Sequence, residues 1–142
     1  MKHSDITIRP FDEADEAAVI ALWNKVFDYS APHNDPAASI RRKLDVHREL
    51  FLVAVMDGSV IGTVMGGYDG HRGWIHSMAT DPESQKKGIG TLLMQHVEQA
   101  IKARGCVKIN LQVREDNAEV IAFYKSLGYD TEPRVSMGKR LM

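Results

Sequence analysis

The chain has 142 residues, a formal net charge of −1 at pH 7 and a single cysteine. This length suits one domain over residues 1–142. The near-zero charge gives no reason to expect binding to nucleic acid or to an anionic membrane. No apolar run approaches the ~20 residues that a membrane span needs. Because Cys106 has no partner for a disulfide within the chain and the histidines show no metal-ligand spacing, we expect a cytoplasmic protein without a metal site.

The N-terminal part of the chain predicts a short strand followed by a helix. Ile6 and Ile8 alternate with polar neighbours, as in a half-buried strand. Asp12 or Asp15 is then placed to cap a helix whose apolar side chains recur at helical spacing. That apolar stripe consists of Val19, Leu22, Trp23, Val26 and Phe27.

A second helix and a hairpin come next. The pair Asp35-Pro36 is typical of an N-cap followed by proline at the first helical position, which predicts a helix over 36–44. Apolar runs at 50–56 and 60–65 flank Asp57-Gly58, a residue pair that favours a tight hairpin turn. We therefore expect two antiparallel strands here.

The segment after the hairpin combines a strand with a candidate anion site. Residues 73–80 predict a strand, and residues 81–91 lead into an amphipathic helix. The first N–H groups of a helix have no partner within the helix and carry partial positive charge. Glycines at this point let an anion approach the backbone closely, so the turn suits a phosphate or pyrophosphate. The apolar stripe of the helix consists of Ile89, Leu92, Leu93, Val97, Ala100 and Ile101.

The spacing of the glycines limits which class of phosphate ligand the turn can bind. The turn lacks the G-x-x-x-x-G-K-[ST] pattern of a P-loop, and Leu93 stands where a dinucleotide fingerprint needs its third glycine. The remaining pattern, Gln85-x-x-Gly88-x-Gly90, resembles the acetyl-CoA pyrophosphate loop of the GNAT superfamily of N-acetyltransferases. Taken alone, this loop also fits an ordinary surface helix with a glycine-rich start.

A second pattern follows at the distance of one helix and one strand. Alternating apolar residues predict a strand over 107–113, after which Asp116 or Asn117 caps a short helix. Asn117, Phe123-Tyr124 and Gly128-Tyr129 fit N-x(5)-F-Y-x-x-x-G-[FY], which resembles the second GNAT signature. The two signatures occur in the order that the superfamily has them.

The order of the predicted elements also resembles the GNAT fold. Strands at 129–131 and 135–141, separated by Pro133, complete the expected sheet. The resemblance implies an α/β (α+β) domain with a mixed, mainly antiparallel sheet of six to seven strands and helices on both faces. The central strands, 73–80 and 107–113, are expected to splay apart at their C-terminal ends.

The resemblance implies an acyltransferase that moves the acetyl group of acetyl-CoA directly to a primary amine of a small molecule or peptide, with coenzyme A as the product. Two alternatives stay open. A non-catalytic CoA-binding or sensing module would have no need of a proton donor such as Tyr124. Transfer of a longer acyl group would depend on the bulk of the residues beside Met78.

The resemblance also implies which residues hold acetyl-CoA. The pantetheine arm is expected to pair with the backbone of 78–80 like an added strand, and the pyrophosphate to lie on N–H groups of the glycine turn. The two lysines of the turn either add charge for the phosphates or are simply solvated. The expected cofactor-binding residues are Met78, Ala79, Thr80, Gln85, Lys86, Lys87, Gly88, Ile89, Gly90, Thr91, Asn117 and Tyr124.

Acetyl transfer needs a proton donor for the departing sulfur and a base for the amine. Tyr124 stands at the position of the general acid in the GNAT signature, and aromatic packing is its alternative role. His76 can accept a proton near neutral pH, while Asp69 and a water chain are the alternative bases. The N–H of Met78 or of its neighbour is expected to stabilise charge on the carbonyl oxygen.

The acceptor amine is expected to contact the region of the first helix and the loop that contains Tyr29, His33 and Asp35, with residues 132–134 on the other side. These residue types do not select among an amino acid, a peptide N-terminus, a lysine side chain, a polyamine and an aminoglycoside. The sequence also leaves the oligomeric state open, with a homodimer as one option.

Overall fold

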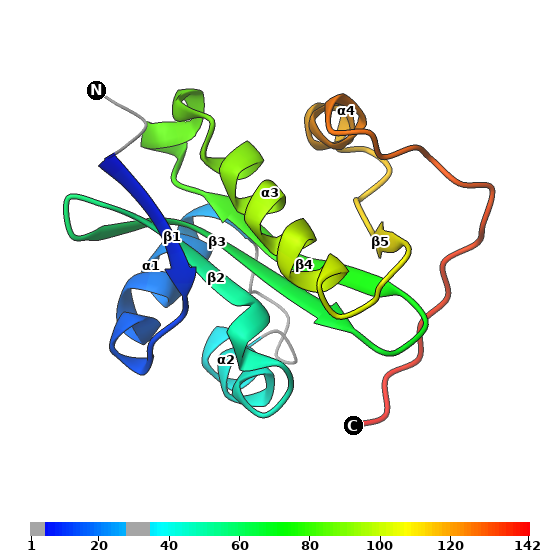
Figure 1. Cartoon of the computed structure of the whole chain (residues 1–142), viewed down its shortest axis with the longest axis horizontal. Helices are drawn as coiled ribbons and strands as arrows, with labels where there is room; N and C mark the ends of the chain where they lie inside the picture. The colour runs from blue at the N-terminus through cyan, green and yellow to red at the C-terminus, as the bar shows by residue number, and fades with distance from the viewer. Residues whose placement is uncertain (1–4, 28–34) are drawn as a thin grey trace. The chain divides into compact units, whose positions relative to one another are not determined.

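The computed structural model describes residues 5–27 and 35–142, so Tyr29 and His33 lie outside the described residues. Contacts divide the chain into two compact units, Met1–Gln112 and Val113–Met142, and each is described by itself. The first unit contains the sheet and the helices α1 to α3, and the second contains α4 (Figure 1).

The sheet has the strand order β1-β2-β3-β4-β5. Its strands are β1 (Ile6–Pro10), β2 (Phe51–Met56), β3 (Ser59–Tyr68), β4 (Gly73–Thr80) and β5 (Ile109–Leu111). The first four are antiparallel neighbours, and β5 is parallel to β4. Asp57 and Gly58 have φ of 51° and 77°, the positive values that a two-residue hairpin turn requires, so the predicted hairpin is confirmed.

Helices lie on both faces of the sheet, as expected (Figure 1). The helices of this unit are α1 (Glu16–Val26), α2 (Pro36–Leu44) and α3 (Ile89–Lys102). Alternation along β3 separates the two layers, because successive side chains of a strand point to opposite faces. A Cβ placed at Gly62 or Gly66 would meet side chains of α3, whereas Thr63 and Met65 point toward α1 and its core.

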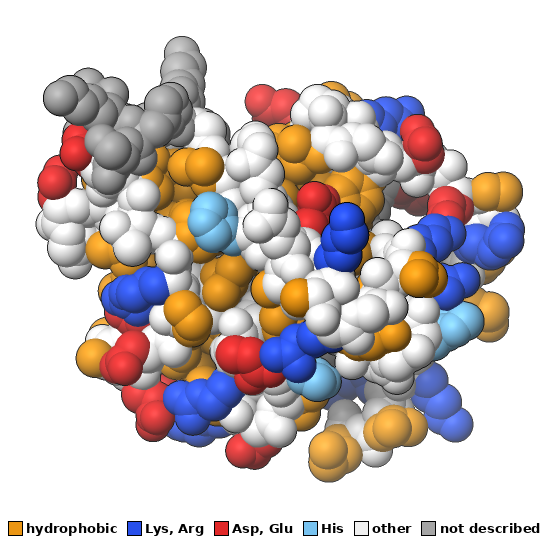
Figure 2. All heavy atoms as spheres, in the orientation of Figure 1, with side chains coloured by type: hydrophobic (Ala, Val, Ile, Leu, Met, Phe, Trp, Pro, Cys, Tyr) orange, Lys and Arg blue, Asp and Glu red, His pale blue; other side chains and the backbone are white. Residues whose placement is uncertain are grey.

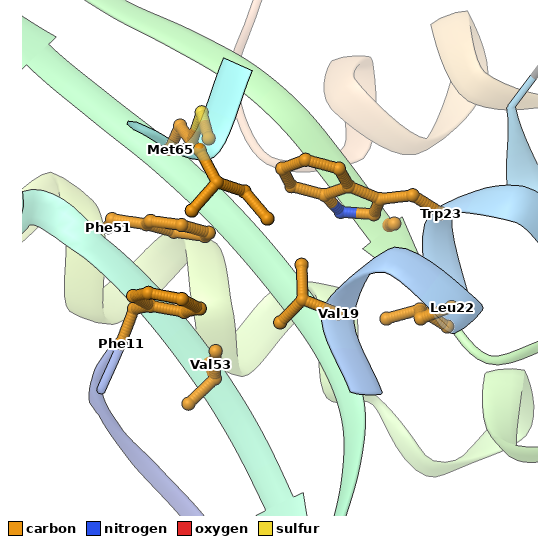
Figure 3. Packing of buried hydrophobic residues seen from close by; sticks show 9 residues of the cluster. Phe11, Val19, Leu22, Trp23, Phe51, Val53 and Met65 are labelled. Atoms are coloured by element: carbon orange, nitrogen blue, oxygen red, sulfur yellow. The ribbon is translucent and has the colours of Figure 1, made fainter. Parts of the chain in front are cut away.

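Aromatic rings form the centre of the core between α1 and the sheet. The rings of Phe11 and Phe51 are stacked with centroids 4.5 Å apart, and the Trp23 ring lies 6.0 Å from that of Phe51 (Figure 3). The apolar stripe predicted for the first helix is buried at Val19, Leu22 and Trp23. Apolar side chains removed from water in this way are the main stabilising contribution to such a fold.

The two predicted caps, Asp12 and Asp15, cap the 3₁₀ helix Glu13–Asp15 that precedes α1, and Asp15 makes no side-chain capping bond to α1 itself. The Asp12 side chain accepts a hydrogen bond from the N–H of Ala14 at 2.9 Å, and the Asp15 side chain accepts one from the N–H of Asp12 at 2.9 Å. Asp15 also accepts from the guanidinium of Arg9, which is the main reason why the pKa of Asp15 is lowered. The two aspartates therefore share the capping of this turn.

Charged side chains of both signs lie side by side on the face of the molecule shown in Figure 2. An ion pair between Arg41 and Glu16 joins α2 to α1, with a distance of 3.5 Å between nitrogen and oxygen. Exposed pairs of this kind stabilise a fold by only about 0–1 kcal/mol. Among the described residues, no helix is long and apolar enough to cross a bilayer.

The C-terminal part of the chain differs from the expectation. The second unit contains α4 (Ala118–Ser126), but residues 129–142, all of them described, contain no strand. The strands expected at 129–131 and 135–141 are therefore wrong, and the sheet has five strands instead of six to seven. Val135 and Met137 are 86% and 90% exposed, so their alternation does not place them on a buried face.

The physical reason is that a strand needs more than alternating side chains. It needs a neighbouring strand for its backbone and an apolar layer to cover one face. Pro133 has no N–H to donate to such a neighbour. The same limit shortens β5 to Ile109–Leu111, although alternation extends over 107–113.

Candidate functional site

The parallel ladder between β4 and β5 ends before β4 does. Its last pair joins Ile75 to Leu111, whereas β4 continues to Thr80. Residues 76–80 pair with β3 on one side, and no strand in the described part of the chain pairs with them on the other. The predicted splaying of the central strands is confirmed. This stretch of strand edge contains Met78, Ala79 and Thr80, and because the Ala79 side chain is buried in the core, only its backbone faces the edge.

A β-bulge interrupts β4 at Ser77 and Met78. These two residues oppose the single residue Val64 of β3, where the register shifts. Ser77 has a φ of 52°, in the left-handed region that costs a residue other than glycine roughly 1–2 kcal/mol. The bulge therefore lies on the same edge that the resemblance assigns to the pantetheine arm and the thioester.

The bulge also changes which layer the side chains face. Ile75 and Ala79 are an even number of residues apart and would share a face in a regular strand. Instead Ile75 pairs with Gly66 on the α3 side, and Ala79 pairs with Thr63 on the α1 side. The sequence predicted a regular strand and missed this bulge. The one signal for it in the sequence is that both Ile75 and Ala79 are apolar, as suits residues that pack against the two layers.

A buried chain of hydrogen bonds connects α1 to the bulge. Trp23 Nε1 donates to Thr63 Oγ1 at 2.8 Å, and Thr63 Oγ1 donates to the carbonyl oxygen of Ser77 at 2.9 Å. Trp23 and Thr63 are both fully buried. The single hydroxyl proton is thus donated to the bulge, while a lone pair of the same oxygen accepts from the indole.

The glycine turn after β4 is held at its start by Asp81. The Asp81 N–H donates to the Ile61 carbonyl at 2.8 Å, and the Asp81 side chain accepts from the N–H of Glu83 at 3.0 Å. A 3₁₀ helix, Pro82–Lys87, follows. Gly88, with φ of 72°, then joins this helix to α3 in a conformation that glycine adopts without strain.

The N-terminus of α3 has the features of an anion site. Its N-cap residue, Gly88, has no side chain with which to cap it, and its first turn contains no acidic residue. The buried Ile89 anchors the turn to the core, while Gly90 and Thr91 are half-buried. Of Gln85, Lys86 and Lys87 the structure describes the backbone but not the side chains. The backbone N–H groups of the first turn are therefore suited to bind a phosphate.

The expected base, His76, lies on β4 opposite Met65, on the side of the sheet that carries α1 and α2. Its side chain reaches solvent. Desolvation by the surrounding protein, and then the positive charge of Lys43, lower the pKa of His76 from the usual 6.5. Lys43 itself is held by donating from Nζ to the Gly66 carbonyl oxygen at 2.5 Å. His76 is therefore mostly neutral at pH 7 and able to accept a proton.

The alternative base, Asp69, lies in the exposed turn between β3 and β4. Its side chain accepts from the N–H groups of Arg72 and His71, each at 2.7 Å. These bonds, Arg72 first, lower the pKa of Asp69. A carboxylate with a lowered pKa is a weaker base, which favours His76 over Asp69.

The second unit contains the two residues expected from the second signature. Asn117, not Asp116, caps α4, with its side-chain oxygen accepting from the N–H of Val120 at 3.2 Å. Tyr124 is 7% exposed, and its ring meets Phe123 and Tyr129 edge to face, with centroids 5.1 and 5.7 Å away. Burial raises the pKa of Tyr124 to about 12, so its phenol stays protonated across the neutral range.

Of the expected acceptor residues, the structure describes only Asp35. Its side chain accepts from the N–H of Ala38 at 3.3 Å and caps α2, with Pro36 following as predicted. Tyr29 and His33 lie outside the described residues. Within the described ranges, no group of three or more histidine, cysteine or carboxylate side chains is arranged to hold a metal ion.

Comparison with known proteins identifies the family. The model of the acetyltransferase (GNAT) family matches residues 16–129. An acetyltransferase of Pectobacterium atrosepticum is 46% identical over 135 residues, which cover 95% of each chain. The chain therefore belongs to the GNAT family of acetyltransferases, and it is an acyltransferase.

Solved structures agree with this assignment. Ard1 from Thermoplasma volcanium has a TM-score of 0.75 and 28% identity, covering 87% of this chain and 82% of its own. The complex of AAC(6')-Iy with the bisubstrate analog CoA-S-monomethyl-acetylneamine has a TM-score of 0.79. At 15% identity, over 96% of this chain and 99% of the other, that second match shows the fold alone. The predicted family, fold class and enzyme class are confirmed.

Proposed function

We propose that this chain is an N-acetyltransferase that moves the acetyl group of acetyl-CoA directly to a primary amine of a small molecule or peptide. The observation that carries the proposal is the succession of two features in one unit. The β4 edge at residues 76–80 is not covered by any strand in the described part of the chain, and it leads into the uncapped N-terminus of α3. The first suits the amides of a pantetheine arm, and the second suits a pyrophosphate.

The backbone is the main holder of the co-substrate in this proposal. Met78 and Thr80 pair with the pantetheine amides, with Ala79 between them. The N–H groups over 86–91 bind the pyrophosphate, where Gly88 and Gly90 leave room for it. Gln85 opens this turn, and Asn117 adds a contact to the pantetheine while it caps α4. The proposal needs no charge from Lys86 or Lys87, although their cations would strengthen the site.

Acetyl-CoA, when bound, supplies a thioester whose acetyl carbon is attacked by the amine while the carbon–sulfur bond breaks. In this proposal the Met78 N–H, beside the bulge, donates to the carbonyl oxygen as charge develops there. His76 takes the proton that the amine must lose. Tyr124, which is protonated at neutral pH because its pKa is raised to about 12, donates to the departing sulfur. The amine loses one proton and the departing thiol gains one, so the reaction has no net change in protons.

The acceptor amine needs a binding site of its own. We assign it to the loop with Tyr29 and His33 and to Asp35, whose carboxylate is suited to a cationic amine. The AAC(6')-Iy complex contains an acetylneamine analog, so amino sugars belong in an acceptor panel beside amino acids, peptides and polyamines. A cytoplasmic location rests on the single cysteine.

The test is release of free thiol by the purified protein with acetyl-CoA and a panel of amines. Thiol release that depends on one class of amine supports the proposal and identifies the acceptor class. Tight binding of acetyl-CoA without thiol release for any amine would favour a CoA-sensing module. Faster release from a longer acyl-CoA with the same amine would assign a different acyl donor.

A further inference from the structure

The hydrogen-bond chain from Trp23 through Thr63 to Ser77 has no role in the steps above. Its first two members, Trp23 and Thr63, are fully buried beside the apolar side chains between α1 and the sheet, and Ser77 is half-buried. A buried hydroxyl and a buried indole N–H are costly unless both are bonded, and here each satisfies the other. The hydroxyl oxygen of Thr63 accepts from the indole, and its single proton is donated to the carbonyl oxygen of Ser77.

That carbonyl belongs to the strained residue of the bulge. Ser77 has a φ of 52°, which a side chain other than hydrogen disfavours, so the bulge tends to relax unless contacts hold it. The Thr63 hydroxyl is such a contact, and Trp23 fixes the hydroxyl from the opposite side. The next residue along the strand is Met78, whose N–H is the proposed donor to the thioester carbonyl.

We infer that Thr63, held by Trp23, is a positioning residue for acetyl transfer: its hydroxyl fixes the Ser77 carbonyl and thereby the direction of the Met78 N–H. This inference rests on the proposed function. It explains why a polar pair occupies the core at this point, since a valine at position 63 would fill a similar volume without a hydroxyl. Trp23 of α1 thus acts on the reaction through the interior of the protein, by way of Thr63 and Ser77.

The test compares Thr63→Val with Thr63→Ser, which keeps the hydroxyl, and with Thr7→Val, a control at an exposed threonine of β1. Turnover is measured below the melting temperature of each variant with the acceptor that the amine panel identifies. Thr63→Val is expected to lower kcat about 10-fold or more while the KM for acetyl-CoA changes less than about 2-fold, because the lost contact matters in the transition state. Thr63→Ser and Thr7→Val are expected to keep the wild-type kcat.

Two further arms separate positioning from stability. Ser77→Gly in the Thr63→Val background is expected to restore part of kcat, because glycine adopts the positive φ without an anchor. The amide signal of Met78 in the NMR spectrum is expected to shift on addition of acetyl-CoA in the wild type and less in Thr63→Val. If Thr63→Val does not fold, Thr63→Cys, with a weakly donating thiol, replaces it.

The outcomes are distinct. If Thr63→Val has a lower melting temperature but an unchanged kcat, Thr63 is a stabilising residue only, and the inference is overturned. The same conclusion follows if kcat falls and Ser77→Gly does not restore any of it. A wild type that binds no acetyl-CoA would overturn the proposed function, and the inference with it. If the wild type binds acetyl-CoA but acetylates no amine, the NMR shift of the Met78 amide tests the inference instead. Equal shifts in the wild type and in Thr63→Val would then refute it.

Discussion

Ile75 of β4 and Leu111 of β5 form the last pair of the parallel ladder, and beyond them β4 continues to Thr80. The five-strand sheet therefore stops being continuous at the point where β4 leads, through Asp81 and the 3₁₀ helix, to Gly88 and the first turn of α3. A strand edge and a helix N-terminus thus follow each other along one short stretch of chain. Changes to the backbone of this stretch are expected to act on the binding of the co-substrate.

Gly88→Ala is expected to weaken the binding of CoA about 10-fold or more, because a Cβ would stand where the phosphate approaches the backbone. The matched control is Gly58→Ala, since Gly58 has a similar φ of 77° against 72° at Gly88 and lies in the hairpin turn with no atom within 4 Å of an added Cβ. Calorimetry measures the affinity, and thermal unfolding shows whether the two variants lose similar stability. Equal affinities for CoA in both variants would exclude the glycine turn as the pyrophosphate site.

Tyr124→Phe is expected to lower kcat by about 10²- to 10⁴-fold, the usual contribution of a general acid, while CoA affinity stays near that of the wild type. Burial raises the pKa of Tyr124 to about 12, so the activity should show no alkaline loss from this group below about pH 11. Tyr68→Phe, which removes an exposed hydroxyl that bonds to Gly70, is the control. If Tyr124→Phe had the turnover of the wild type, Tyr124 would have a packing role only, and water would be the proton donor.

If His76 is the base, kcat/KM for the acceptor should fall at low pH as His76 becomes protonated, with a midpoint below 6.5, because its pKa is lowered. Lys43→Met removes the positive charge that contributes to this shift, so the midpoint should move upward toward 6.5. Lys43→Arg keeps the charge and should leave the midpoint nearly unchanged.

The measurement is the pH dependence of kcat/KM with one acceptor throughout, so that ionisation of the acceptor amine is common to all variants. A midpoint that Lys43→Met does not move, or an acidic limb that persists in His76→Gln, would assign the base to a water chain.

Asp35→Asn tests the acceptor site without disturbing the helix. Asparagine is as good an N-cap as aspartate, so α2 should keep its stability, whereas Asp35→Ala should lose about 1 kcal/mol. If the carboxylate binds the amine, Asp35→Asn raises the acceptor KM and leaves the acetyl-CoA KM unchanged. Alanine at Tyr29 and at His33 is expected to have the same effect. An unchanged acceptor KM in all of these variants would move the acceptor site to the segment 132–134.

Local chemistry made most of the first unit predictable. The capping pair Asp35-Pro36, the Asp57-Gly58 turn and the strand 73–80 were all predicted, because each depends on the residue types at a few neighbouring positions. The family, fold class and enzyme class followed from two short patterns.

What the sequence did not predict depends on contacts between distant residues. The bulge at Ser77 is hydrogen-bonded to Thr63, which in turn is bonded to Trp23, and these two residues come from β3 and α1. Alternating side chains predicted strands after Tyr129, but alternation alone does not provide the neighbouring strand and the covering layer that a strand needs, and the structure assigns no strand there. The lowered pKa of His76 likewise depends on desolvation by the surrounding protein and on the charge of Lys43, which is distant in sequence.

The central claim is transfer of the acetyl group to nitrogen, and mass spectrometry tests it directly. The wild type and Gly88→Ala are incubated with acetyl-CoA carrying ¹³C in its acetyl group and with the amine that supports thiol release. The account predicts that the wild type produces the acceptor with the labelled acetyl group on its amine, and that Gly88→Ala produces much less at low acetyl-CoA concentration. Thiol release by the wild type with the label in free acetate, and none on the amine, would contradict it.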